Sequence, residues 1–143
     1  MSYKAVNQYA KVGTQSGVEH ANPHRLIQML MAGSLEKIAT AKGHMERGNV
    51  AEKGRHISWA ISIIGGLQAS LDLKQGGELA SNLNDLYEYM CERLVLANIN
   101  NDTEILDEAS RIMTNIKAGW DGIEDEAKNI FSNQNTLSTD SVS

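Results

Sequence analysis

Apolar residues recur at intervals of three and four along most of the chain, the spacing that places side chains on one face of an α-helix. Four stretches show this period, at about residues 23–45, 50–71, 77–100 and 102–128. No stretch alternates apolar and polar residues as a half-buried β-strand would. The pattern therefore predicts an all-α protein.

Short connections separate the four predicted helices. Asn22 and Pro23 begin the first, because Asn caps a helix and Pro at the first helical position loses no needed N–H. Gly76 and Gly77 divide the third from the fourth. Helices of ~20–25 residues with short connections pack as an antiparallel four-helix bundle. We expect residues 1–11 to form a short extra N-terminal helix that lies across the bundle.

The length of 143 residues fits one domain, since domains typically run ~100–200 residues. We expect a single helical-bundle domain over residues 1–131. Beyond Phe131 the composition turns to Ser, Asn, Gln and Thr. Such a segment can bury too little apolar surface to fold, so we expect residues 132–143 to form a disordered tail.

Charge and hydropathy argue against two classes of partner. Thirteen basic and eighteen acidic residues give a net charge of -5, and the basic residues are scattered singly. No stripe exists to follow a phosphate backbone, so we expect no nucleic-acid binding. The longest uncharged window, residues 57–71, is shorter than the ~20 apolar residues of a membrane span, and no signal peptide begins the chain. We expect a cytoplasmic protein without membrane insertion.

No motif in the chain points to catalysis. Di-iron bundles need Glu-x-x-His pairs, and no acidic residue here has a His three positions later. His20 and His24 have metal-ligand spacing, but Asn22 and Pro23 break the helix face that they would need. His44 and His56 are interpreted as ordinary, partly exposed residues. The lone Cys91 reads as a buried thiol. We therefore predict no enzyme activity, no metal and no cofactor.

The third predicted helix carries apolar residues on two faces. Its main stripe includes Ile57 and Ile64, and a second stripe contains Trp59, Ile63 and Leu67. One interpretation is that neighbouring helices cover both stripes. The other is that the second stripe forms a groove for a partner's helix, with these three side chains as anchors. The leucines of the fourth helix are predicted to lie mainly in the bundle core.

Two dense motifs carry a family resemblance. Over roughly residues 5–120 the chain resembles the flagellin-specific export chaperones, the FliS family. The matching positions are Asn22-Pro23-x-x-Leu26-Ile27-x-Met29-Leu30-x-x-Gly33 and Gly77-Glu78-Leu79-Ala80-x-Asn82-Leu83-x-x-Leu86-Tyr87-x-Tyr89-Met90-x-x-Arg93-Leu94-x-x-Ala97-Asn98-Ile99-x-Asn101-Asp102.

The resemblance implies a cytoplasmic chaperone that binds the C-terminal segment of flagellin. It would prevent premature polymerisation and deliver the subunit to the flagellar export gate. Tyr9 matches an N-terminal segment that, in the family, lies over part of the flagellin-binding surface. Tyr87 is the expected contribution of the fourth helix to that surface. The alternative is a regulatory or structural bundle that self-associates through the same apolar surface, as a homodimer when free.

Overall fold

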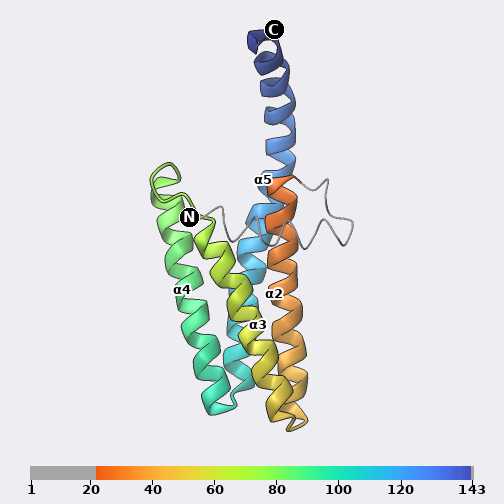
Figure 1. Cartoon of the computed structure of the whole chain (residues 1–143), viewed down its shortest axis with the longest axis vertical. Coiled ribbons are helices and arrows are strands. Elements are labelled where there is room, and N and C mark those ends of the chain that lie inside the picture. Colours follow the sequence, from red (N-terminus) through yellow and green to blue (C-terminus); the bar gives the residue numbers. More distant parts are fainter. Residues whose placement is uncertain (1–21, 143) are drawn as a thin grey trace.

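The computed structural model describes the backbone of residues 22–142 and the side chains of residues 22–123. Over this range the chain forms helices and no strand (Figure 1). They are α2 (Pro23–Glu46), α3 (Val50–Ala69), α4 (Gly77–Asn100) and α5 (Thr103–Val142). The all-α prediction is confirmed. The predicted helix over residues 1–11 lies outside the described residues.

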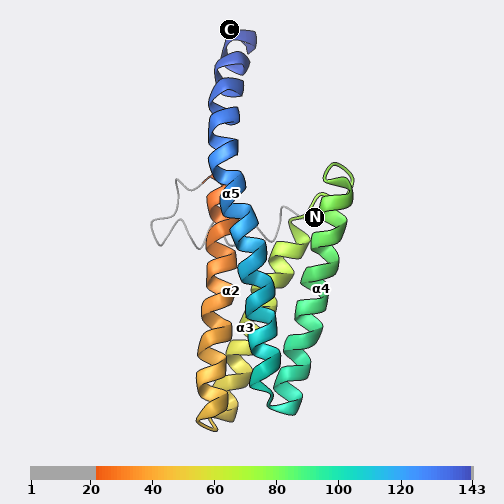
Figure 2. The same cartoon turned by 180° about the vertical axis from the view of Figure 1, so that it is seen from behind.

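The four helices run alternately up and down around one core. α2 packs against α3 and α5, and α4 packs against the same two helices, so each helix has two close neighbours. Figure 2 shows the same order from behind, with the α2–α3 and α4–α5 connections at one end of the bundle. The structure is therefore the predicted antiparallel four-helix bundle.

The helix ends follow from local chemistry. The side-chain oxygen of Asn22 accepts a hydrogen bond from the backbone N–H of Arg25 at 2.7 Å, which caps α2, and Pro23 follows it. Gly48 in the α2–α3 connection has a φ of +75°, a left-handed conformation that costs glycine little. Asn101 takes the same conformation at the end of α4, where Asn is the commonest substitute for glycine.

α5 is longer than the sequence indicated. The predicted helix ends near Lys128, whereas the structure continues it to Val142, and Figure 1 shows its last part projecting beyond the other helices. The continuation has a simple reason: no Gly or Pro interrupts residues 123–142. The division into a domain over residues 1–131 and a separate tail stays a prediction.

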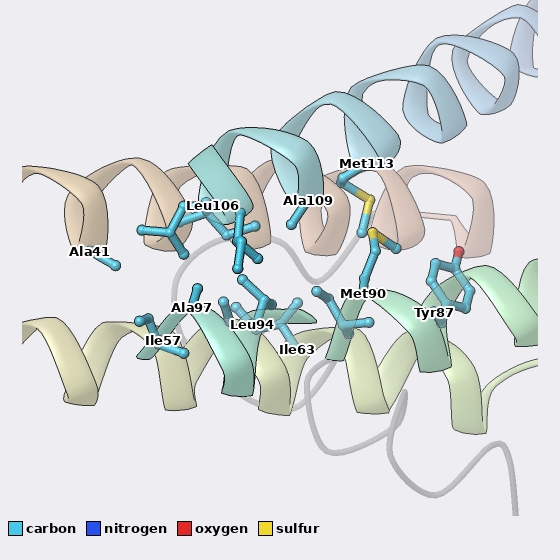
Figure 3. Packing of buried hydrophobic residues seen from close by; sticks show 14 of the residues in the cluster. Ala41, Ile57, Ile63, Tyr87, Met90, Leu94, Ala97, Leu106, Ala109 and Met113 are labelled. Carbon is cyan, nitrogen blue, oxygen red and sulfur yellow. The ribbon is translucent and has the colours of Figure 1, made fainter. Parts of the chain in front are cut away.

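The core changes character along the bundle axis. Fully buried alanines, Ala41, Ala97 and Ala109, lie toward the end with the α2–α3 connection, and Met90 and Tyr87 lie toward the other end (Figure 3). Small side chains let helix axes approach closely, whereas bulky ones hold them apart. In Figures 1 and 2 the α3–α4 pair diverges from α2 and α5 toward the end with the α3–α4 connection.

Burial on α3 shows how far neighbouring helices cover each of its apolar stripes. Ile63 and Leu67 of the second stripe belong to the same buried core cluster as Ile57 and Ile64 of the first. α3 has α2 on one side and α4 on the other, and these helices bury Ile63 and Leu67 but leave Trp59 45% exposed. The two faces of this helix therefore do not form an open groove on their own.

The leucine stripe of α4 is also only partly core. Leu94 is fully buried, but Leu79 is 64% and Leu86 39% exposed. The buried positions of α4 are instead Ala80, Tyr87, Met90, Leu94 and Ala97. α4 thus turns a face more apolar than expected toward the outside. Among the described residues, no helix has the length and apolarity that a bilayer span requires.

Candidate functional site

An apolar groove of about 730 Å³ opens at the end where the helix pairs diverge. All four helices contribute apolar side chains to it. They are Leu26, Ile27 and Met31 from α2, Leu67 from α3 with Leu71 just beyond it, Leu79, Leu83 and Tyr87 from α4, and Ile116, Trp120 and Ile123 from α5.

The groove has a buried floor and an exposed rim. Met31, Leu67 and Tyr87 form the floor and are almost completely buried. The rim is set by Leu79 on α4 and Ile123 on α5, both of which are exposed. Such a surface, apolar at its base and open at its edges, can accept the apolar face of a helix.

A reciprocal contact fixes one wall of the groove. The indole N–H of Trp120 donates to the backbone oxygen of His24 at 3.0 Å, and Nε2 of His24 lies 2.7 Å from the backbone oxygen of Trp120. The two rings stack with centroids 4.7 Å apart. Because these contacts join the first turn of α2 to α5, Trp120 is held in place beside the groove.

A polar network supports the same wall from outside. Lys117 donates to the Asp121 carboxylate at 2.9 Å, and the side-chain amide of Gln28 on α2 donates to it as well. The hydrogen bond from Lys117, followed by that from Gln28, lowers the pKa of Asp121. The carboxylate is therefore ionised at neutral pH and links α2 to α5 next to the His24–Trp120 contact.

Tyr87 connects the groove to the core. Its ring closes the row of buried side chains, with the hydroxyl at the outer end (Figure 3). Burial raises the pKa of Tyr87 to about 12. An exposed tyrosine titrates near 10, so the unfolded chain releases this proton at lower pH than the folded protein.

Tyr87 should therefore make the protein sensitive to alkali. As the pH rises from about 10 to about 12, we expect the free energy of unfolding to fall by up to about 2–3 kcal/mol. The stabilisation is fully present below pH 10, because the phenol is then neutral in both states. Urea unfolding at several pH values measures the effect, with Tyr87→Phe as the comparison. An equally steep decline in Tyr87→Phe would contradict it.

The residues predicted to bind a partner do not all meet. Leu67 and Tyr87 lie together in the groove floor, and Ile63 lies in the closed core. Trp59 is 45% exposed on a different surface, where the ammonium group of Lys37 lies 3.8 Å from its ring centre. Tyr9 is outside the described residues.

Other groove residues escaped the sequence analysis. Leu26 and Ile27 were noted within the family motif, and nothing in the sequence marks them, Ile116 or Trp120 as bordering an opening. One signal was available at Leu79, an apolar residue two positions after the Gly76–Gly77 break. The short polar connection between α3 and α4 cannot cover the apolar side chains where these two helices end and begin.

The lining of the groove offers little for catalysis. Among the described residues its titratable groups are Asp72 and Tyr87, and the Ser70 hydroxyl donates to the backbone oxygen of Leu67 and not to a base. Cys91 lies elsewhere, and burial, followed by Glu88 and Glu92, raises the pKa of its thiol. A protonated, half-buried thiol is a poor nucleophile. The arrangement suits binding of an apolar segment.

Comparison with known proteins gives a consistent result. Residues 5–127 match the family model described as "Flagellar protein FliS". Flagellar secretion chaperone FliSB of Pseudomonas aeruginosa is 57% identical over 120 residues, which cover 84% of this chain and 95% of that protein. Flagellar secretion chaperone FliS of Salmonella typhimurium is 42% identical over 85% of this chain and 91% of its own length. The Vibrio cholerae protein of that name is 37% identical, over 88% of this chain and 93% of its own.

Proposed function

The chain belongs to the FliS family of flagellar secretion chaperones, and we propose that it binds the C-terminal segment of flagellin in the apolar groove. The family is one of chaperones and not of enzymes. The observation that carries the proposal is the groove itself, an apolar opening to which all four helices contribute. It is the surface of this bundle best suited to shield an apolar segment.

The chemistry of the groove matches that of such a client. An amphipathic segment with apolar residues at helical spacing self-associates when its apolar face is exposed. In the groove that face would meet Leu26, Leu83 and Ile116, which are half-buried in the free protein. Burying apolar surface gains roughly 25 cal/mol per Å², which offsets the cost of ordering the segment. Binding there would prevent premature polymerisation.

The outer face of α4 extends the surface available to the client. Tyr89, Val95, Leu96 and Ile99 are exposed apolar or aromatic side chains on this helix, beyond the groove. Clusters of such residues on a protein surface mark interaction sites. A client segment longer than the groove would continue along α4.

The N-terminal segment is a second component of the proposal. Pro23, the first residue of α2, lines the groove, so the preceding segment joins the bundle at the edge of the binding surface. In the absence of client, Tyr9 and its neighbours would cover apolar groove residues and leave when flagellin binds. The complex would form in the cytoplasm and deliver flagellin to the flagellar export gate.

Titration with a flagellin C-terminal peptide tests the proposal. We expect one peptide per chain, with a dissociation constant in the micromolar range or below. Amide hydrogen exchange should slow in the first turns of α2 and α4, which border the groove. A lack of binding at micromolar concentrations would contradict the proposal.

Size-exclusion chromatography separates this function from self-association. If the groove instead joins two copies of the chain, the free protein should elute as a dimer, and the peptide should convert it to a monomeric complex. If the protein elutes as a dimer both with and without the peptide, a structural or regulatory bundle would be favoured over a flagellin chaperone.

A further inference from the structure

Three side chains able to bind a metal meet at the end of the bundle opposite the groove. His44 lies in the last turn of α2, and Glu52 and His56 lie in the first turns of α3. One nitrogen of each histidine and one carboxylate oxygen lie within 4.8 Å of one another. Figure 1 shows the α2–α3 connection at the far end of the bundle from the α3–α4 connection.

We propose that His44, Glu52 and His56 form a binding site for a divalent transition metal such as Zn²⁺. Two imidazoles and one carboxylate are ligands that Zn²⁺ accepts, with water at a fourth position. Bonds of ~2.0–2.1 Å in a tetrahedron place the donor atoms about 3.4 Å apart. The donor atoms lie within 4.8 Å of one another in the free protein, so the side chains would rotate to reach that distance when a metal binds.

The orientation of His56 favours this role. Its Nδ1 lies 2.8 Å from the backbone oxygen of Glu52, which can only accept, so Nδ1 carries the proton. Nε2 is then the nitrogen with a lone pair for a metal, whereas Nδ1 is the nitrogen that lies 3.8 Å from the Glu52 carboxylate oxygen. Metal-binding histidines characteristically donate their other N–H to a carbonyl in this way. The His56 ring is also largely buried, which limits its motion.

His44 also presents a lone pair, but to neighbouring donors. The side-chain amide of Asn49 and the Arg47 guanidinium lie 3.2 and 3.4 Å from its Nδ1. Both groups are donors, so this nitrogen acts as the acceptor. Contacts of this length are weak and can be exchanged for a metal bond.

Arg55 is the main competitor for the site. Its guanidinium pairs with the Glu52 carboxylate at 2.8 Å. A metal must therefore share this carboxylate with a cation. Removing that cation should strengthen metal binding, whereas removing any of the three ligands should weaken it.

A bound metal would join α2 to α3 across their short connection. Two of its ligands come from α3 and one from α2, so it would restrain the turn over residues 47–49. The groove lies at the other end and shares none of these residues. Metal binding and client binding are therefore independent, and either can be absent without the other.

Calorimetric titration of the untagged full-length protein with Zn²⁺ tests the site. We expect one equivalent to bind, and His44→Asn, Glu52→Gln and His56→Asn each to weaken binding at least about tenfold. His20→Asn is the matched control and should bind as the unaltered protein does. Arg55→Ala should bind Zn²⁺ more tightly. Circular dichroism confirms that each variant stays helical.

Trp59 provides a second readout. Its ring lies 6.1 Å from that of His56, so Cu²⁺ in the site should quench its fluorescence. In a Trp120→Phe background Trp59 is the sole tryptophan, and quenching should disappear with His56→Asn. The proposal is overturned if Zn²⁺ does not bind stoichiometrically, or if binding survives His44→Asn and His56→Asn. Loss with His20→Asn alone would also overturn it.

Discussion

Leu79→Asp should weaken binding of the flagellin C-terminal segment by roughly 10- to 100-fold. Leu79 stands on the rim of the groove and is 64% exposed in the free protein. In the complex its side chain would be buried against the client, which is worth about 1.5–3 kcal/mol for a leucine. An aspartate at this position loses that gain and must also bring a charge into an apolar contact.

The free protein should tolerate this change. Exposed positions contribute little to folding, so the free energy of unfolding should stay within about 0.5 kcal/mol of the original. Val50→Asp is the matched control, because Val50 is 69% exposed at the opposite end of the bundle. Calorimetry with the peptide measures both variants. If Leu79→Asp and Val50→Asp bound the peptide with equal affinity, the groove would not be the binding site.

Leu94→Ala should destabilise the folded protein by about 2–5 kcal/mol. Leu94 lies on α4 in the centre of the core cluster and is 0% exposed. Truncation removes buried methyl groups and leaves a cavity that the four packed helices can fill only in part. A protein of this size typically has 5–15 kcal/mol of stability in total. The variant should therefore unfold at clearly lower urea concentration.

Leu96→Ala makes the same chemical change two residues later. Leu96 is 36% exposed on the outer face of α4, so little cavity forms, and we expect a loss below about 1 kcal/mol. Urea unfolding followed by circular dichroism compares the two variants at equal helix propensity. A similar loss in both would mean that Leu94 is not a central core residue.

The helices were predictable because their signals are local. The Asn22 cap, the glycine breaks and the three-four spacing each act within a few residues, and the structure reproduces the helices that they predict. The end of α5 was predicted less well. The spacing predicted an end near Lys128, whereas the helix extends to Val142, and no Gly or Pro interrupts residues 123–142.

The site was predicted only in part, because a stripe of apolar residues does not say what covers it. Ile63 and Leu67 share a face of α3, yet Ile63 lies in the closed core and Leu67 in the groove floor. The difference comes from their positions along the axis, since Leu67 is one turn closer than Ile63 to the end where the groove opens. Trp59 belongs to the same stripe but lies outside the bundle core.

The sequence by itself determined the helical bundle and the resemblance to secretion chaperones, since both depend on residue spacing along the chain. Only the tertiary structure decided where the bundle opens and which side chains meet there. Leu26 and Leu83 reach the same groove from helices far apart in sequence. His44 and His56 were likewise interpreted as ordinary, partly exposed residues; Glu52 and His56 are four residues apart on α3, and the α2–α3 turn brings His44 beside them. Such encounters depend on helix crossing and divergence, which result from packing between helices and leave no periodic trace in the chain.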